Sequence, residues 1–283
     1  LYKLRPQFIG IIVLHILALI KLVITGKKFD IVHIHGDWSS IVLANLIKKI
    51  SKSKKLIMTM HSSLSNNLYS RKALALFLPK VDLVFATGYD LASELMGITA
   101  REVIVQPSGI RDIFFKNAHK NRNKIKRVVV VSNLLKRKNL DLVIEIAKKL
   151  NFLDFTIVGD GPEKNHLFNR ISNESVSNVQ IIGSKSSKEL HSIYSKSDVF
   201  LLTSTKEGTP TAMLEAMACG LPIITSNVGG VENILGKHNF ISIKNDREHF
   251  IDCFNSLIAK KDLLNQIAKD NISISLEYNW NNV

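Results

Sequence analysis

The chain has 283 residues, of which 46% are hydrophobic, and this excludes a disordered protein and leaves room for two α/β domains of ordinary size. Its formal net charge of +14 favours an anionic partner, such as an acidic membrane surface or a phosphorylated substrate. The cysteines, Cys219 and Cys253, define neither a disulfide framework nor a metal site, and they suit a reducing compartment, the cytoplasm.

The amino-terminal part of the chain alternates helices and strands. An apolar helix at 8–24 precedes a strand at 30–36. The helical run is 17 residues long and contains His15 and Lys21, so we expect a helix packed within a domain rather than a membrane span. A helix resting on the membrane surface is the alternative. Further strands are predicted at 55–61, 83–88 and 102–109, separated by helices near 40–50, 72–78 and 90–96.

A second series of strands and helices follows a polar, basic stretch at 117–126, which predicts a linker between domains at 1–116 and 127–283. The strands of this series are predicted at 127–134, 154–162 with a tight turn at its end, 179–183, 198–204 and 240–244, and a last helix at 247–267. Strands separated by helices of this length indicate βαβ units and parallel sheets. We therefore expect an α/β protein with two Rossmann-like parallel-sheet domains facing a cleft.

The most informative stretch is TSTKEGTPTAMLEAMACGLPIITS at 203–226, which joins a strand end, a loop, a helix and a second strand. Thr209 is expected to be the N-cap of the helix, because Pro210 suits the first helical position. Gly220 is expected to end the helix. The helix therefore begins at the carboxyl end of a strand, where open α/β sheets bind ligands.

Two acids, Glu207 and Glu215, lie on either side of this helix start. A helix N-terminus favours an anion such as phosphate, here through Thr209, Pro210 and Thr211, and Gly208 allows a ligand to approach the backbone closely. The alternative is that Glu207 caps a loop and Glu215 lies on a solvated helix face, since glutamate is common on helix surfaces.

The spacing of Glu207 and Glu215 resembles the acid–seven–acid signature of glycosyltransferase family four, and EGTPTAMLEAMACGLPIITS is similar to that family throughout. The resemblance covers about 30–283 and is strongest in the second domain. It implies the GT-B fold and sugar transfer from a nucleotide diphosphate donor with retention of configuration. It also implies that Glu215 binds the donor ribose and that Glu207 contacts the transferred sugar.

The segment VSNLLKRKN resembles the family's loop that holds the donor diphosphate. Lys138 matches the family's lysine. Asn133 stands where the family has arginine, so one positive charge is missing, and Lys136 or Arg137 is a candidate to replace it.

The segment TIVGDGPE resembles the loop that contacts the nucleotide base, with Gly159, Asp160 and Gly161 at the matching positions. Without the resemblance, Gly-Asp-Gly predicts only a tight turn.

In the first domain, His61 resembles the family's strand-end histidine beside the donor sugar, and Ser108 before Gly109 stands where the family usually carries asparagine. Glu207 and His61 are the catalytic candidates, and His35, Ser108 and Gly109 are the candidates on the acceptor side. His33 and His35 alternate on one face of a strand, but no third ligand lies near them in the sequence, so packing and hydrogen bonding are expected instead of metal binding.

No Asp-x-Asp pair occurs in the sequence, so a metal-independent reaction is expected, with a nucleotide sugar as co-substrate and no further cofactor. The family also has a glycine-rich loop after its first strand. The chain has none there and opens directly into an apolar helix, so we expect the first domain to be incomplete at its start.

The expected activity is a retaining transfer of a hexosyl or related group to a glycan or lipid-linked acceptor in bacterial surface polysaccharide or lipopolysaccharide synthesis. The expected location is cytoplasmic and peripheral on the inner face of the cell membrane. A nucleic-acid partner is not expected, because no aromatic interleaving or nucleic-acid-binding fingerprint accompanies the basic residues. The alternatives are a GT-B nucleotide-sugar epimerase, a phosphorylase and a non-catalytic basic binding protein.

Overall fold

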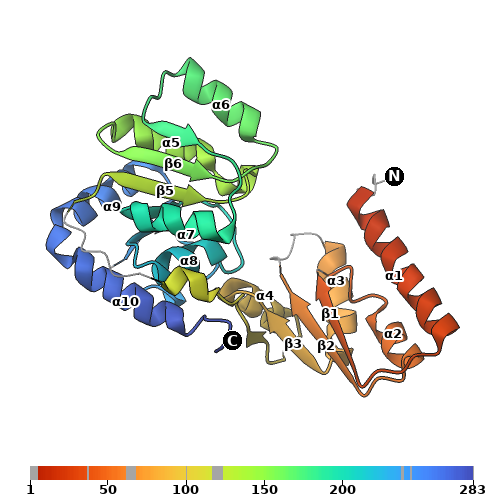
Figure 1. Cartoon of the computed structure of the whole chain (residues 1–283). Helices are drawn as coiled ribbons and strands as arrows, with labels where there is room; N and C mark the ends of the chain where they lie inside the picture. Colours follow the sequence, from red (N-terminus) through yellow and green to blue (C-terminus); the bar gives the residue numbers. More distant parts are fainter. Residues whose placement is uncertain are drawn as a thin grey trace. The chain divides into compact units, whose positions relative to one another are not determined.

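The computed structural model divides the chain into two compact units, Leu1–Pro107 and Ser108–Val283. It describes residues 6–36, 38–61, 68–99, 101–116, 124–236, 239–242 and 244–282. Each unit is an α/β domain built on a parallel sheet, as predicted (Figure 1). The boundary precedes the predicted linker at 117–126, of which 117–123 lie outside the described residues.

The sheet of the first unit has the strand order β1-β2-β3-β4. Its strands are β1 (Ile31–Gly36), β2 (Lys55–Met60), β3 (Leu83–Ala86) and β4 (Ile104–Val105). The helices are α1 (Pro6–Thr25), α2 (Ala44–Ile50), α3 (Leu68–Phe77) and α4 (Tyr89–Thr99). Apolar side chains of β2, such as Leu56 and Met58, are buried in a core shared with α3 and α4. Each strand therefore enters the sheet as the next step of a βαβ series.

Helix α1 is the apolar helix that the sequence predicts ahead of β1. Several of its apolar side chains are exposed, among them Leu14, Leu17, Val23 and Ile24. Among the described residues, no helix is both long enough and apolar enough to cross a membrane.

The sheet of the second unit has the order β10-β9-β8-β5-β6-β7. Its strands are β5 (Arg127–Val131), β6 (Asp154–Val158), β7 (Val179–Ile181), β8 (Val199–Leu202), β9 (Ile223–Ser226) and β10 (Phe240–Ser242). The chain runs from β5 outward to β7 and then returns to β8 on the other side of β5. The strand order thus reverses between β5 and β8, which is the topological switch point where such sheets bind ligands.

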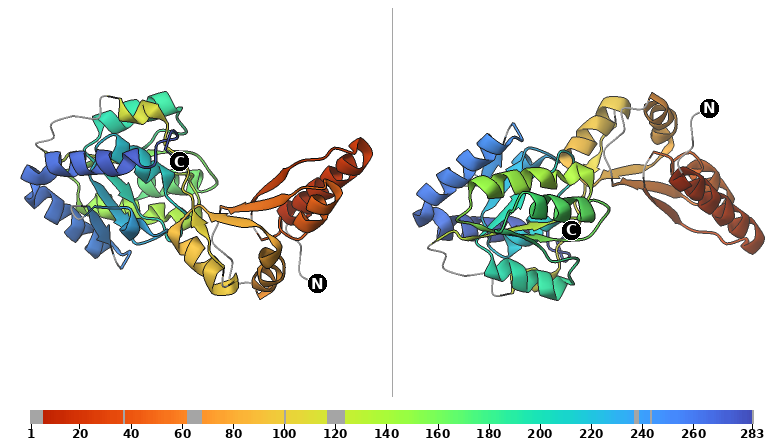
Figure 2. Two further views of the ribbon diagram at one scale, coloured as in Figure 1. Left: turned by 90° about the horizontal axis from the view of Figure 1, so that it is seen from below. Right: turned by 90° about the horizontal axis from the view of Figure 1, so that it is seen from above.

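Helices cover both faces of this sheet (Figure 2). They are α5 (Leu140–Lys149), α6 (Lys164–Asn173), α7 (Ser187–Lys196), α8 (Thr211–Ala218), α9 (Arg247–Ala259) and α10 (Leu264–Leu276). Alternate strand residues such as Phe155 and Ile157 enter a core with α5 and α9, where the rings of Phe155 and Phe254 lie 6.1 Å apart. On the other face, the ring of Phe200 lies 6.3 Å from that of Tyr194 on α7.

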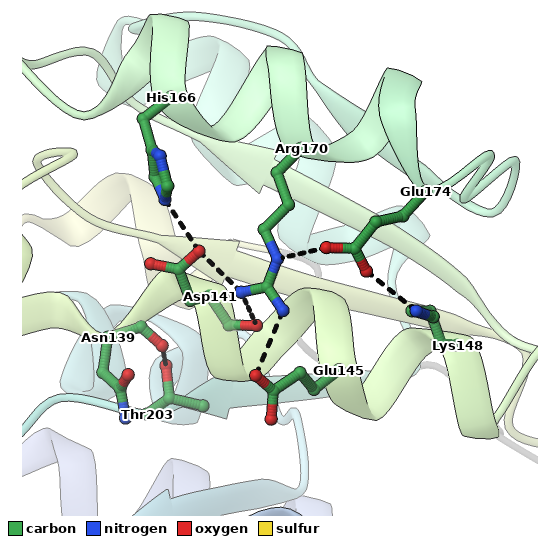
Figure 3. Close-up of polar contacts among 8 residues, drawn as sticks. All are labelled: Asn139, Asp141, Glu145, Lys148, His166, Arg170, Glu174 and Thr203. Atoms are coloured by element: carbon green, nitrogen blue, oxygen red, sulfur yellow. Dashed lines mark hydrogen bonds and ion pairs between the residues drawn. The ribbon is translucent and has the colours of Figure 1, made fainter.

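An ion-pair network joins α5 to α6 (Figure 3). The guanidinium of Arg170 lies 2.6 Å from Asp141, 3.1 Å from Glu145 and 2.7 Å from Glu174. Lys148 pairs with the second oxygen of Glu174 at 2.8 Å. Arg170 thus contacts three carboxylates directly, and Lys148 joins the network through Glu174. The network fixes α6, the helix that follows the predicted base loop, against α5.

Two expectations about strand and helix boundaries are wrong. The single helix predicted at 247–267 is two helices, α9 and α10, because the chain turns at Lys260 so that Leu257 and Leu264 can both enter the core. The strand predicted at 102–109 is reduced to β4, since the chain leaves the first sheet there. Ile110 instead forms a parallel bridge with Asn279 in the second unit.

Candidate active site

A cavity of about 360 Å³ lies at the switch point of the second unit. The loops that follow β5, β6, β7 and β8 line it, together with the start of α8. Because the strands are parallel, all these loops leave the sheet at its carboxyl edge. Residues from several of the sequence motifs line this cavity, including Asn133, Lys138, Gly159, Glu207 and Thr209.

The loop after β5 and the loop after β8 are joined by hydrogen bonds. The Thr203 hydroxyl donates to the carbonyl oxygens of Lys138 and Asn139 at 3.0 and 3.1 Å, and the second of these bonds is drawn in Figure 3. The Thr205 N–H donates to the Arg137 carbonyl at 2.8 Å. Asn139 has a φ of +50°, in the left-handed region that asparagine tolerates. These bonds fix Arg137 and Lys138 beside the loop that carries Glu207.

The Glu207 carboxylate is buried, with 7% of its side chain exposed, and it faces two cations. Lys138 Nζ donates to Glu207 Oε1, and the lysine side chain is only 12% exposed. Arg137 Nη1 lies 3.5 Å from the other oxygen, Oε2. A buried carboxylate needs such pairing, because an unpaired charge in the interior is costly. Glu207 is thus not a solvated surface acid.

Helix α8 directs its first turn at the cavity through Thr211 and Ala212. The predicted N-cap is wrong by one residue, since Pro210 is the N-cap and Thr211 is the first helical residue. The Met213 N–H donates to the Pro210 carbonyl at 2.9 Å and closes the first turn there. Proline at this position has no N–H group to offer, so the dipole of α8 and the threonine groups remain as the features that favour an anion.

Glu215 lies one turn beyond Thr211 on the same face of α8. Burial raises the pKa of its carboxyl to about 7, although a hydrogen bond from the Tyr194 hydroxyl and the charge of Arg111 both lower it. Tyr194 lies 3.3 Å from Glu215 Oε2 and is fully buried. The carboxyl group is therefore held in one orientation, and near neutral pH it exists in both its charged and uncharged forms.

The loop after β6 requires both of its glycines. Gly159 has a φ of +146°, and a Cβ atom there would lie 1.8 Å from the Ser132 carbonyl oxygen. Gly161 has a φ of +155°, and its Cβ atom would lie 2.6 Å from the Leu134 carbonyl oxygen. Asp160 accepts from the Gly161 N–H and from Lys164 at 2.8 Å each, and these bonds lower the pKa of its carboxyl. Of the three residues, Gly159 lines the cavity, and Asp160 shapes its own loop.

Ser132 is part of the cavity wall, and the sequence did not single it out. Its Oγ atom is inaccessible to solvent and has no hydrogen-bond partner among the described residues. Buried hydroxyl groups usually have a partner, so the Ser132 hydroxyl is an exception in the wall of the cavity. Asn133 beside it is exposed and also lines the cavity.

Gly208 contributes through its backbone. A Cβ atom on Gly229, which has a φ of +65°, would lie 1.9 Å from the Gly208 carbonyl oxygen. The loop after β9 therefore packs directly on the segment between Glu207 and α8.

Two family models match the chain. One, described as glycosyl transferases group 1, matches residues 111–273, and the other, described as glycosyltransferase family 4, matches residues 2–114. The chain belongs to the glycosyl transferases group 1 family. The resemblance that the Glu207 and Glu215 spacing predicts is thereby confirmed.

Relatives in this family are distant in sequence. One component of the phosphatidylinositol N-acetylglucosaminyltransferase of Arabidopsis thaliana is 24% identical over 280 residues, which cover 94% of this chain and 62% of the relative. TuaC of Bacillus subtilis, named for teichuronic acid biosynthesis, is 26% identical over a match that covers 76% of this chain and 57% of TuaC. The chain thus spans about three fifths of these relatives.

Among solved structures, Anabaena HepE in complex with UDP and glucose has a TM-score of 0.77 at 17% identity, covering 92% of this chain and 77% of HepE. This likeness establishes the GT-B fold that the sequence predicts.

In the first unit of this group 1 glycosyltransferase chain, three histidines lie together at the carboxyl edge of the sheet. His35 Nδ1 lies 3.1 Å from His61 Nε2, and the two rings stack with centroids 5.4 Å apart. The His33 and His35 rings are 4.1 Å apart, and His33 Nε2 bonds to Thr59 at 2.8 Å. The sequence predicts that His33, His35 and His61 lie toward the carboxyl ends of two strands, and the structure shows in addition that the His35 ring contacts both of the others.

The three rings are exposed, and the pKa values of His33 and His61 are lowered first by a partial loss of solvation where neighbouring atoms pack on them and then by the neighbouring histidines. Across the described residues, no group of three or more histidine, cysteine, aspartate or glutamate side chains could hold a metal ion.

Ser108 and Gly109, predicted for the acceptor side, open the second unit. Ser108 is exposed, and Gly109 lies against the Trp280 ring, where a Cβ atom would come within 2.5 Å. Gly109 is therefore required for packing against the carboxyl-terminal segment, and Ser108 keeps an accessible side chain.

A larger hollow, of about 460 Å³, lies at the amino edge of the second sheet beside Arg127 and Asn178. Its main polar side chains already have hydrogen-bond or ion-pair partners within the protein. Arg127 pairs with the buried Asp198 at 3.1 Å, and the Asn178 amide donates to three carbonyl groups. The smaller cavity at the carboxyl edge, with its charged and unpaired groups, is the better candidate for chemistry.

Proposed function

We propose that this chain acts as a retaining, metal-independent glycosyltransferase that takes a sugar from a nucleotide diphosphate donor. One observation carries the proposal. The cavity at the switch point is lined by Lys138 and by the N-terminus of α8, which suit a diphosphate. Glu215, which is not among the described residues that line the cavity, lies one turn further along α8 and suits a ribose diol.

The donor would lie along the carboxyl edge of the second sheet. Its diphosphate would lie at the ends of β5 and β8, where Lys138 and Thr211 line the cavity. Its base would extend toward β6 and β7, where Gly159 and Ser184 line the same cavity. Adjacent strands lie about 4.8 Å apart, so the distance from β8 to β7 suits an extended nucleotide diphosphate.

The reaction breaks the bond between the anomeric carbon and the donor diphosphate, whose oxygen keeps the electron pair. It forms a bond from that carbon to an acceptor hydroxyl oxygen, and the hydroxyl proton passes to the leaving diphosphate. Negative charge then grows on the leaving phosphate. Lys138 and the dipole of α8 would stabilise that charge, while Glu207 would hold the hydroxyl groups of the sugar. His61 on the first unit is our candidate for contact with the transferred sugar.

A glycan or lipid-linked acceptor is supported by the names of two relatives, one acting on phosphatidylinositol and one in teichuronic acid synthesis. The net charge of +14 suits an acidic or lipid-linked acceptor at the inner face of the cell membrane. Synthesis of a bacterial surface polysaccharide is the role we propose.

A thermal-shift screen against UDP-, GDP- and ADP-sugars tests the proposal, because a ligand that binds only the folded state raises the melting temperature. UDP-glucose is the first donor to test, since HepE binds UDP and glucose. We expect one nucleotide class to stabilise the chain, and Lys138→Ala and Glu215→Ala to weaken that effect. Undiminished stabilisation and turnover in both variants would overturn the assignment.

A further inference from the structure

Glu207 shares its carboxylate between two cations that differ in their surroundings. Lys138 bonds to Oε1, lines the cavity and is 12% exposed. Arg137 approaches Oε2 at 3.5 Å, is 49% exposed and is not among the described residues that line the cavity. One cation therefore faces the place of the donor, and the other supports Glu207 from the solvent side.

The position of Arg137 is fixed independently of any ligand. Its carbonyl oxygen accepts from the Thr205 N–H at 2.8 Å and from the Thr205 hydroxyl at 3.1 Å. Its Nη1 also lies 3.3 Å from the Lys206 carbonyl, immediately before Glu207. Both ends of the arginine thus contact the loop after β8, and its guanidinium is directed to the backbone and the side chain of adjacent residues.

A diphosphate entering the cavity competes with Glu207 for Lys138, because both are anions and one ammonium group cannot face both equally. Glu207 would then lose its closest cation while remaining buried. A guanidinium stays charged across the physiological pH range and can hold a carboxylate oxygen with defined geometry.

We propose that Arg137 is a positioning residue for Glu207, holding Oε2 when Lys138 turns to the donor diphosphate. This inference rests on the proposed function, and it concerns a residue that the sequence suggests only as a replacement for the missing arginine of the diphosphate loop. The proposed role differs from that of the family arginine whose place Asn133 takes. A substitute for that arginine would contact the donor phosphate itself. Arg137 contacts the carboxylate.

The test compares Arg137→Ala, Arg137→Lys and Lys138→Ala in the full chain. UDP affinity is measured by calorimetry, and turnover is measured as release of free sugar from UDP-glucose. Lys148→Ala is the matched control, since Lys148 has a similar exposure of 47% and pairs with Glu174 away from the cavity. If the thermal-shift screen selects another nucleotide class, that nucleotide and its sugar are used instead.

Arg137→Ala is expected to lower kcat about tenfold or more while UDP affinity stays within about twofold, because the loss is one of orientation. Arg137→Lys should restore part of kcat, and Lys138→Ala should weaken UDP binding. An Arg137→Ala variant with unchanged kcat, or one that loses UDP affinity as Lys138→Ala does, overturns the positioning role alone. A wild-type chain that binds no nucleotide and releases no sugar overturns the proposed function, and the positioning role falls with it.

A second measurement does not depend on turnover. The melting temperatures of Arg137→Ala, Glu207→Gln and the double variant form a cycle that reports whether the two side chains interact. We expect the double variant to lose less than the sum of the single losses. Strictly additive losses would overturn the contact on which the inference rests.

Discussion

The two units place different chemistry on the same architectural feature, the carboxyl edge of a parallel sheet. In the first unit this edge carries His33, His35 and His61, which are exposed and contact one another. In the second unit it carries a buried Glu207 bound by Lys138, beside a helix N-terminus and a cavity of about 360 Å³.

Of these two sheet edges, the one in the second unit has the positive groups that an anion requires already in place. Charges in a sheltered cavity interact more strongly than in water, and here they are held close to the place proposed for the donor. The exposed imidazoles of the first unit are close to solvent, where charge interactions are weak. We therefore propose that the second unit binds the donor, and we expect substitution of His35 to change the stability of the first unit only slightly.

Gly159→Ala should have the largest effect on stability among the substitutions at the carboxyl edge of the second sheet. A Cβ atom 1.8 Å from the Ser132 carbonyl must displace backbone, so we expect a loss of roughly 3 kcal/mol or more in the free energy of unfolding. Gly183→Ala is the matched control, because Gly183 has a φ of +72° with no atom within 4 Å of its added Cβ. That substitution should cost about 1 kcal/mol. Equal losses in urea denaturation would show that close approach to Ser132 is not what requires Gly159.

Glu215→Gln should change stability and ligand binding in opposite directions, raising the free energy of unfolding at pH 8 and weakening the binding of UDP. The carboxyl has a pKa of about 7 in the folded chain, so the folded state holds its proton more tightly than the unfolded state does. The wild-type chain therefore loses stability as the pH rises from about 4.5 to above 7, and the glutamine variant escapes that loss. At pH 8 we expect the variant to be more stable by about 1–3 kcal/mol.

The same Glu215→Gln variant should bind UDP more weakly, because an amide oxygen and NH₂ group cannot replace a carboxylate that accepts two ribose hydroxyl bonds. Denaturation at pH 5 and pH 8, with UDP titration at pH 8, measures both effects. A variant that is destabilised at pH 8, or one that binds UDP as the wild type does, contradicts this role.

His35→Ala should have the smallest effect. The pKa values of His33 and His61 are lowered in the folded chain, so the folded state resists protonation and loses stability as the pH falls below about 6.5. Removing the ring between them should flatten that decline slightly, and melting temperatures from pH 7.5 to 5.5 measure it. A decline that is steeper without His35 would mean that this imidazole stabilises its neighbours' charge.

Much of the fold could be predicted from the sequence because its signals are local. Runs such as RVVVV and VFLL alternate with amphipathic helices, and glycine or proline marks many of the turns. The split between α9 and α10 could not be predicted in this way. The residues around Lys260 are compatible with helix, and the turn is set by the burial of Leu257 and Leu264.

Of the candidate site, the sequence predicts the main residues but not all of the contacts between them. The family pattern identifies Lys138, Glu207 and Glu215, and the structure places Lys138 and Glu207 in direct contact. The partners Arg137 and Tyr194 were not predicted in these contacts. They lie 70 and 21 residues from the acids they touch, and only tertiary packing decides such pairs. The unpaired Ser132 hydroxyl likewise becomes visible only when the cavity is formed.

The most direct test of the account is calorimetric titration of UDP, GDP and ADP into the wild-type chain, Lys138→Ala and Lys148→Ala. The account predicts saturable binding of at least one of these nucleotides to the wild type, a loss of about tenfold or more in affinity for Lys138→Ala, and a change within about twofold for Lys148→Ala. No saturable binding to the wild type, or equal affinity in all three proteins, would contradict the claim that the second unit's strand edge is a nucleotide diphosphate site.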